Sequence, residues 1–206
     1  MGKKSIVIGR QFGSGGFNIG KKLAEDLGYK FYDKELVELV AKKANCSEET
    51  VRKMDESAKG SFLYSIAMGN YSMGTMGGAM YYDLPLNDKL FLAQSEIIKE
   101  KATEEPCVFV GRCADYVLKN ADMDVLSVFI YADTDYKIGN IMKNNNVSQQ
   151  KAKDLITKTE KQRRSYYDYF TSGDWGEMKT YDLCLDSGKL GEATCVEMIK
   201  IAWGKD

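Results

Sequence analysis

Short apolar runs alternate with longer stretches in which apolar residues recur every three or four positions. The short runs are typical of β-strands, which we expect at residues 5–8, 29–32, 107–110, 125–132 and 181–185. The longer stretches predict helices at residues 17–27, 34–44, 48–56, 88–102, 134–143, 149–170 and 192–203. Residues 107–110 are apolar without interruption, as in a strand buried on both faces. This alternation predicts an α/β fold in three layers, a parallel sheet with helices on both faces.

Polar residues and one glycine mark the expected helix ends. A short polar side chain before a helix can accept hydrogen bonds from the free N–H groups of the first turn. Residues of this type precede five of the expected helices: Asp33, Ser47, Asn87, Asp133 and Ser148. Gly28 follows the first helix, and glycine readily takes the left-handed conformation that ends a helix.

Residues 57–86 show no clear period. The stretch and its N-terminal edge are rich in three residue types, at Gly60, Gly69, Gly74, Gly77, Gly78, Met54, Met68, Met73, Met76, Met80, Tyr64, Tyr71, Tyr81 and Tyr82. Methionine and tyrosine form adaptable contact surfaces, which favours a cover over a bound ligand. A poorly ordered loop, or a contact in a homodimer, is an interpretation of equal weight.

Length, charge and cysteine content narrow the class of protein. The 206 residues suit one α/β domain with an insertion or a small lid. The net charge of −1 predicts no general attraction to nucleic acid or to an anionic membrane. The first apolar run is too short for a signal peptide, and no run reaches the roughly 18 residues of a membrane span. Five cysteines without a C-x-x-C pair predict reduced thiols and a cytoplasmic location.

The chain contains no histidine. This excludes histidine-based acid–base catalysis, Ser-His-Asp triads and histidine metal sites. Acidic and basic side chains, backbone amides and bound metal ions remain as chemical groups. Phosphoryl transfer works with this set because it depends on positioning and charge stabilisation more than on a strong base.

A glycine-rich loop separates the first expected strand from the first expected helix. Backbone N–H groups of such a loop can surround a phosphate, and the residues concerned are Gly13, Ser14, Gly15 and Gly16. The loop resembles the P-loop pattern G-x-x-x-x-G-K-[ST], from which it departs at several positions: Arg10 stands at the first glycine and Gly16 stands at the lysine. Asn18 falls near the position of the metal-binding hydroxyl of that pattern. The alternative is an ordinary strand-to-helix turn.

Arg10 is a candidate for the cation that Gly16 cannot supply. A guanidinium can hold two phosphate oxygens at once. The alternative is a surface arginine paired with a carboxylate.

Three further candidates, Asp33, Arg112 and Asp133, each lie just after an expected strand. Ligands of parallel sheets bind at the carboxyl ends of the strands. We therefore expect these residues to lie along one edge together with the glycine loop.

Four segments carry a family resemblance: IGRQFGSGG at residues 8–16, FYDKE at 31–35, VGRCAD at 110–115 and KQRRSYY at 161–167. In this order, and with Leu185-Asp186-Ser187 at the closing strand, the chain resembles the nucleoside monophosphate kinases of the cytidylate kinase-like branch over nearly its whole length. The resemblance implies one P-loop NTPase domain over residues 1–206, with an acceptor-binding insertion at 34–105 and a lid at 134–178. It also implies ATP as phosphate donor, Mg²⁺ as metal and CMP or dCMP as acceptor.

The resemblance also implies roles for single residues. Arg112 would bind the acceptor phosphate, although an ion pair with Asp115 is the structural alternative. Asp115 would read a base edge, because a carboxylate accepts a hydrogen bond from the exocyclic amine of cytosine. Asp33 would orient the acceptor or only cap its helix. Phe17 stands where related chains often have a basic residue, beside the nucleotide.

The expected helix at 149–170 carries a basic run, Lys158, Lys161, Arg163 and Arg164. Lys161 and Arg164 are three residues apart, so they share a helix face and can reach the same phosphates. In a lid, Lys161, Arg163 and Arg164 would neutralise the charge of the transferred phosphoryl group. A solvated charged face is the alternative.

Three functions remain open. The first is an ATP-dependent kinase of a pyrimidine nucleoside monophosphate. The second is a kinase of another small metabolite, with residues 57–86 as the source of the difference. The third is a regulatory module that binds a nucleotide without transferring phosphate, which the glycine at position 16 favours.

Overall fold

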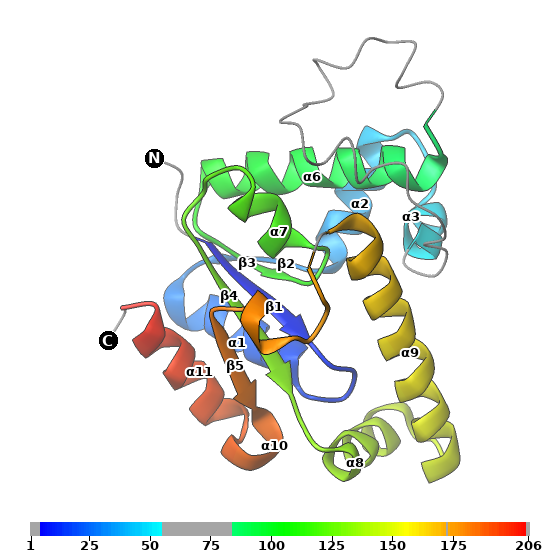
Figure 1. The fold of residues 1–206 in the computed structure, drawn as a ribbon, viewed down its shortest axis with the longest axis vertical. Helices are drawn as coiled ribbons and strands as arrows, with labels where there is room; N and C mark the ends of the chain where they lie inside the picture. The colour runs from blue at the N-terminus through cyan, green and yellow to red at the C-terminus, as the bar shows by residue number, and fades with distance from the viewer. Residues whose placement is uncertain (1–4, 55–83, 172, 205–206) are drawn as a thin grey trace.

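The computed structural model describes residues 5–54, 84–171 and 173–204. Five parallel strands form one sheet in the order β2-β3-β1-β4-β5 (Figure 1). The strands are β1 at Ser5–Arg10, β2 at Lys30–Tyr32, β3 at Cys107–Val110, β4 at Val125–Tyr131 and β5 at Leu183–Asp186. The parallel α/β sheet that the sequence predicts is confirmed, and the carboxyl ends of its strands meet at one edge.

Helices cover both faces of this sheet. They are α1 at Gly16–Leu27, α2 at Lys34–Lys43, α3 at Glu48–Met54, α6 at Leu86–Glu104, α7 at Ala114–Lys119, α8 at Thr134–Asn145, α9 at Gln149–Phe170, α10 at Ser187–Leu190 and α11 at Glu192–Ala202. Helices α1 and α11 share one apolar cluster with the sheet, and α2, α6 and α7 share the other. The carboxyl ends of the strands therefore lie between two layers of helices that are packed firmly on the sheet.

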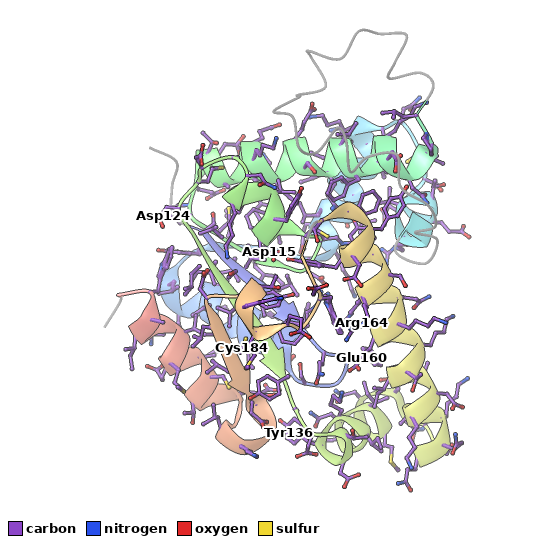
Figure 2. All side chains as sticks on the ribbon, viewed as in Figure 1. Asp115, Asp124, Tyr136, Glu160, Arg164 and Cys184 are labelled. Carbon is purple, nitrogen blue, oxygen red and sulfur yellow. The ribbon has the colours of Figure 1, made fainter. Side chains whose placement is uncertain are left out.

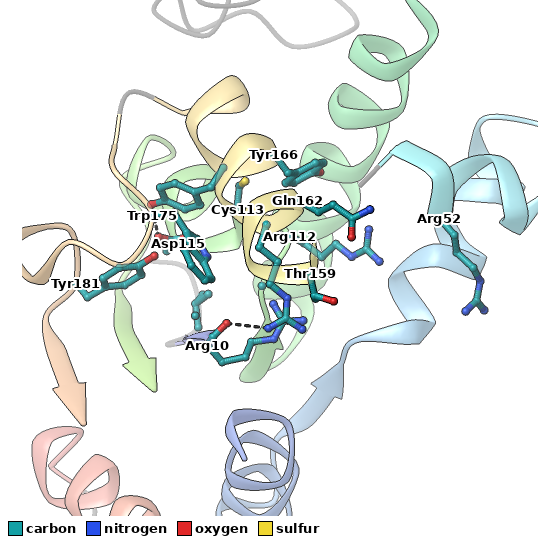
Figure 3. Close-up of a pocket in the computed structure, with 15 residues that line it drawn as sticks. Arg10, Arg52, Arg112, Cys113, Asp115, Thr159, Gln162, Tyr166, Trp175 and Tyr181 are labelled. Atoms are coloured by element: carbon teal, nitrogen blue, oxygen red, sulfur yellow. Dashed lines mark hydrogen bonds between the residues drawn. The ribbon is translucent and has the colours of Figure 1, made fainter. Parts of the chain in front are cut away.

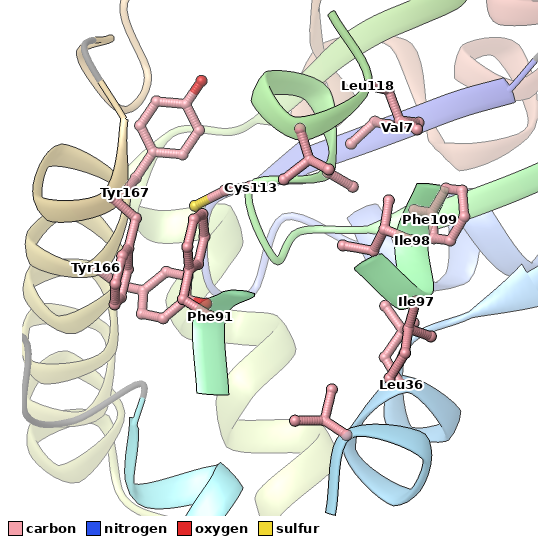
Figure 4. Packing of buried hydrophobic residues seen from close by; sticks show 14 of the residues in the cluster. Val7, Leu36, Phe91, Ile97, Ile98, Phe109, Cys113, Leu118, Tyr166 and Tyr167 are labelled. Atoms are coloured by element: carbon pink, nitrogen blue, oxygen red, sulfur yellow. The ribbon is translucent and has the colours of Figure 1, made fainter. Parts of the chain in front are cut away.

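Side chains of the central strand alternate between the two layers, as the two-residue period of a strand requires. Ile6 and Ile8 belong to the cluster beneath α1 and α11. Val7 belongs to the opposite cluster, which also contains Leu36 and Phe109 (Figure 4). All four residues of β3 are buried, which confirms the prediction made from its uninterrupted apolar run.

The predicted helix caps are confirmed in three cases. Ser47, Asp133 and Ser148 accept hydrogen bonds from backbone N–H groups of the helices that they precede. Asp33 precedes α2 but makes no capping bond with its side chain. The cap expected at Asn87 is wrong, because α6 begins at Leu86 and Pro85 is its N-cap.

Three short elements were not predicted: α7, α10 and the 3₁₀ turn at Met178–Thr180. Each spans six residues or fewer, too short to show a helical period. The last strand begins at Leu183 rather than at residue 181, because the 3₁₀ turn occupies the approach to it.

Helices α8 and α9 form a hairpin at one end of the molecule (Figure 1). Ile138, Ile141, Ala152 and Ile156 pack between them, together with Phe12 from the glycine loop. The buried Lys137 pairs with Glu160 across the hairpin at 2.9 Å. The hairpin is thus anchored to the loop that precedes α1.

Residues 55–83, which hold most of the glycine-, methionine- and tyrosine-rich stretch, lie outside the described residues. Both interpretations of that stretch stay predictions. Within the described residues, no helix has the length and apolar character needed to cross a membrane.

Candidate functional site

The glycine loop has the conformation of an anion cradle. Gly13 and Gly15 take positive φ angles of 88° and 79°, which glycine adopts without steric cost. Helix α1 begins directly afterwards, at Gly16. Across the described part of the chain, no protein group accepts a hydrogen bond from the backbone N–H groups of residues 13–18. These donors, together with the dipole of α1, favour a bound phosphate.

Neighbouring elements hold the loop in place. The Ser187 hydroxyl at the start of α10 lies 2.6 Å from the carbonyl oxygen of Ser14. The Asn140 amide of α8 donates to the carbonyl of Gly13 at 2.9 Å. Ser14 itself is fully buried, and its hydroxyl donates to the carbonyl of Gln11. The loop is preorganised because contacts from distant parts of the chain fix its carbonyl groups.

Arg10 and Gly16, which both depart from the P-loop pattern, are neighbours in space. A Cβ atom added to Gly16 would lie 2.5 Å from the Cβ of Arg10. The Arg10 guanidinium lies against the Cα of Gly111, and its Nη2 is 3.9 Å from Asp33 Oδ1. The side chain of Asp33 therefore faces Arg10 instead of capping α2.

A cavity of about 260 Å³ opens at the carboxyl ends of β1 and β3. Four arginines are among the described residues that line it: Arg10, Arg52, Arg112 and Arg163. They come from β1, from α3, from the turn between β3 and α7, and from α9, so the fold gathers them from distant positions (Figure 3). The only carboxylate among these lining residues is Asp115. Such an excess of guanidinium groups suits an anionic ligand.

Helix α9 presents one face to the cavity. Thr159, Gln162, Arg163 and Tyr166 line it, at the three- and four-residue spacing of a helix face. Arg163 also donates to the backbone carbonyl of Arg10 at 2.8 Å. Among the basic residues predicted on α9, Arg163 thus lies on the face that lines the cavity.

Lys158, Lys161 and Arg164 lie outside the cavity lining and are exposed. The Arg164 guanidinium stands 5.7 Å from the ring centre of Trp175, and Figure 2 shows its position along α9. Of the four basic residues predicted on this helix, the structure brings Arg163 to the cavity.

The inner end of the cavity is aromatic and contains a buried acid. Asp115 is 4% exposed and accepts a hydrogen bond from the Tyr167 hydroxyl at 2.7 Å. Burial raises the pKa of the Asp115 carboxyl, while the bond from Tyr167 acts in the opposite direction. Trp175 and Tyr181 complete this end (Figure 3).

The turn that carries Arg112 is strained. Gly111, Arg112 and Cys113 all have positive φ angles, of 73°, 63° and 53°. For residues other than glycine this conformation costs about 1–2 kcal/mol each. Gln94 of α6 supports the turn by donating to the carbonyl of Arg112 at 3.0 Å. Strain that the surroundings hold in place is common at ligand sites.

Asn18 and Phe17 lie on the first turn of α1, beside the loop. The Asn18 amide nitrogen donates to Glu192 at 3.3 Å, and the Phe17 ring packs edge-on against Phe31. Asp133 caps α8 with its carboxylate, as described above. No cluster of three or more acidic, histidine or cysteine residues that could hold a metal ion occurs among the described residues.

The sequence predicted that Asp33, Arg112 and Asp133 lie along one edge of the sheet with the glycine loop. In the structure Arg112 lines the cavity and Asp33 faces Arg10, whereas Asp133 caps α8. Sequence reasoning did not single out Arg52, Gln162, Trp175 or Tyr181 as lining residues. Arg52 lies in α3, whose sequence carries no motif. The only available signal was that this helix follows β2 and α2 in the chain. Trp175 and Tyr181 lie in irregular chain that has no period to interpret.

Two comparisons with known proteins bear on this arrangement. The model of the cytidylate kinase-like family matches residues 5–189. Among curated proteins, no match was found. A solved structure of an uncharacterized protein from Eubacterium ventriosum is similar to this chain, with 28% identity and a TM-score of 0.71; the match covers 99% of this chain and 100% of that one.

Two further solved structures share the fold at lower identity. A shikimate kinase from Bacteroides thetaiotaomicron has a TM-score of 0.50 at 12% identity, with 97% of this chain and 98% of that chain covered. A gluconokinase from Sinorhizobium meliloti has a TM-score of 0.51 at 17% identity, with 97% of each chain covered. The fold is thus that of the P-loop kinases.

Proposed function

The chain belongs to the cytidylate kinase-like family, and from that membership we propose that it transfers the γ-phosphoryl group of ATP to a nucleoside monophosphate, with CMP or dCMP as the acceptor. The observation that carries this proposal is the juxtaposition of an anion cradle with the arginine-lined cavity. A donor phosphate in the cradle and an acceptor phosphate in the cavity would meet at the carboxyl end of β1.

The arginines support an acceptor that carries its own phosphate. A phosphate monoester has up to two negative charges and three acceptor oxygens, which guanidinium groups bind in pairs. Arg112, held in its strained turn, is proposed to bind this phosphate. Asp33, whose carboxylate faces Arg10, is proposed to orient it through that guanidinium.

The inner end of the cavity supports a cytosine base. Its aromatic side chains offer flat apolar surfaces, and the Asp115 carboxyl can accept a hydrogen bond from an exocyclic amine. In this assignment the acceptor phosphate lies among the arginines of the cavity, and the base lies at its aromatic end.

The glycine loop is proposed to bind ATP through the backbone N–H groups of Gly13, Ser14, Gly15 and Gly16, with Phe17 and Asn18 beside them. Mg²⁺ is usually carried by nucleotide phosphates and takes only one or two protein ligands. The amide oxygen of Asn18, on the first turn of α1, has the oxygen chemistry that Mg²⁺ needs, and Asn18 is proposed as its protein ligand. When bound, Mg²⁺ would neutralise phosphate charge.

During transfer, the acceptor oxygen forms a bond to the γ-phosphorus, and the bond from that phosphorus to the bridging oxygen of the departing ADP breaks. The protein contributes position and positive charge. We assign that charge to Arg10 and Arg163 at the cavity, with smaller contributions from the exposed Lys161 and Arg164. The hairpin of α8 and α9, within the proposed lid at residues 134–178, would exclude water.

The test is an ADP-release assay with Mg-ATP and a panel of nucleoside monophosphates. We expect turnover with CMP or dCMP, and a rise in KM for the acceptor of at least tenfold in Arg112→Ala. Lys200→Ala, on the far helix α11, is the matched control and keeps wild-type kinetics. If none of the nucleoside monophosphates in the panel supports turnover, the proposed acceptor is refuted.

A second candidate, a kinase of another small metabolite, is supported by the shikimate kinase and gluconokinase that share the fold. The same panel, extended with hydroxy acids and sugars, separates the two. Tight ATP binding without transfer to any acceptor would instead indicate a nucleotide-binding regulatory module.

A further inference from the structure

The residues at positions 10 and 16 share one volume. A Cβ atom on Gly16 would lie 2.5 Å from the Cβ of Arg10, 3.1 Å from its Cγ and 3.3 Å from the Cβ of Ile130. Real side chains do not approach so closely. While an arginine occupies position 10, position 16 can therefore hold only glycine. The departures from the P-loop pattern at positions 10 and 16 are thus one coupled exchange.

The exchange moves a cation from the helix to the strand. In the P-loop pattern, the lysine at position 16 reaches the β- and γ-phosphates. In this chain the Arg10 side chain starts beside Gly16, lies against Gly111 and ends 3.9 Å from Asp33. Its guanidinium lines the cavity, and Arg163 fixes its backbone by donating to the Arg10 carbonyl at 2.8 Å.

We infer that Arg10 is the catalytic cation that replaces the P-loop lysine, contacting the phosphoryl group as it passes from the cradle to the cavity. This inference rests on the proposed phosphoryl transfer. The guanidinium stays protonated throughout, since arginine side chains are not deprotonated in proteins. It therefore takes no proton from the acceptor and acts by charge and by its two-pronged geometry.

The coupling between positions 10 and 16 predicts how variants at these two positions behave. Gly16→Lys alone would crowd the Arg10 side chain and displace its guanidinium. Arg10→Gly alone would empty the shared volume and remove the cation. The double variant Arg10→Gly/Gly16→Lys would restore the usual P-loop pairing of glycine and lysine, so each change should relieve the defect of the other.

The experiment measures turnover and ATP affinity for the wild type, both single variants and the double variant. We expect each single variant to lose about 10³-fold in turnover, the scale on which phosphoryl-transfer enzymes depend on such an arginine. The double variant should regain at least tenfold over Arg10→Gly and bind ATP at least fivefold more tightly than it. A folded double variant that is no better than Arg10→Gly in either measurement overturns the inference.

Two further variants keep the test decisive if the double variant does not fold. Arg10→Lys retains the charge, and Arg10→Met retains most of the side-chain length without it. We expect Arg10→Lys to exceed Arg10→Met at least tenfold in turnover; equal activities would overturn the inference. Should the wild type transfer phosphate to no acceptor, the proposed function fails, and ATP affinity across the same variants still decides whether Arg10 contacts the phosphates.

Discussion

Ser187→Ala is expected to weaken both the fold and the phosphate loop. The Ser187 side chain is completely buried, and its hydroxyl lies 2.6 Å from the carbonyl oxygen of Ser14 and 3.0 Å from that of Tyr131. One hydroxyl proton serves both carbonyls, and the shorter contact is to the loop. Alanine keeps the Cβ atom and removes only this donor, so the substitution tests the hydrogen bond alone.

The magnitude follows from the carbonyl groups that lose their partner. A buried polar group left unsatisfied costs about 1–3 kcal/mol. For a chain of this size, each kcal/mol lowers the Tm by about 2–4 °C. We therefore expect a free energy of unfolding lower by about 1–3 kcal/mol and a Tm lower by about 2–12 °C. Since Ser14 belongs to the loop, the KM for ATP should rise as well.

Ser95→Ala is the matched control. Its hydroxyl is also buried, but it donates to the carbonyl of Phe91, one helical turn earlier within α6. The backbone of a helix already pairs such a carbonyl, so we expect a loss of less than about 0.5 kcal/mol. Urea unfolding and thermal unfolding measure both variants. Equal stability of the two variants, or an unchanged KM for ATP in Ser187→Ala, would refute the reasoning.

Three other predictions concern the cavity. Burial raises the pKa of the Asp115 carboxyl, so as pH rises the unfolded chain loses this proton first and wild type is destabilised. The stability of Asp115→Asn relative to wild type should therefore increase from about pH 4 upward and level off above the folded-state pKa, as urea unfolding across pH would show. Gly111→Ala, at a φ of 73°, should lose about 1–2 kcal/mol in urea unfolding and lower turnover by displacing the Arg10 guanidinium. Arg163→Ala should lower turnover at least tenfold more than Arg164→Ala, and equal losses would contradict the orientation of α9.

Much of the fold follows from local pattern. The run from Cys107 to Val110 predicted a doubly buried strand because neither face of it carries a polar residue, and the structure confirms it. The cap at Asn87 was wrong because Pro85 fixes the backbone two residues earlier than the polar residue suggests. Short elements such as α10 escape prediction, since tertiary contacts, like that of Ser187 with the loop, stabilise them more than their own sequence does.

The site was predictable where it depends on strand ends. Asp33 and Arg112 follow parallel strands, so topology alone places them near the glycine loop. Sequence could not decide which face of α9 turns inward, because Lys161 and Arg164 share one face, Arg163 lies on another, and all three suit a phosphate. The choice depends on packing: Tyr166 and Phe170 are buried against Phe91 of α6, and this fixes the helix so that Arg163 faces the cavity.

The glycine at position 16 shows how a sequence motif can mislead when its positions are considered singly. Taken alone, the missing lysine favours a protein that binds a nucleotide without transferring phosphate. In the folded chain the lysine is absent where an arginine side chain already fills the space, 2.5 Å from any Cβ that could be added. The cation is relocated rather than deleted, and it stands at the cavity where an acceptor would lie. The absence of lysine is therefore no argument against catalysis in this chain. The turnover of the paired variants at positions 10 and 16 tests whether Arg10 takes the place of the lysine.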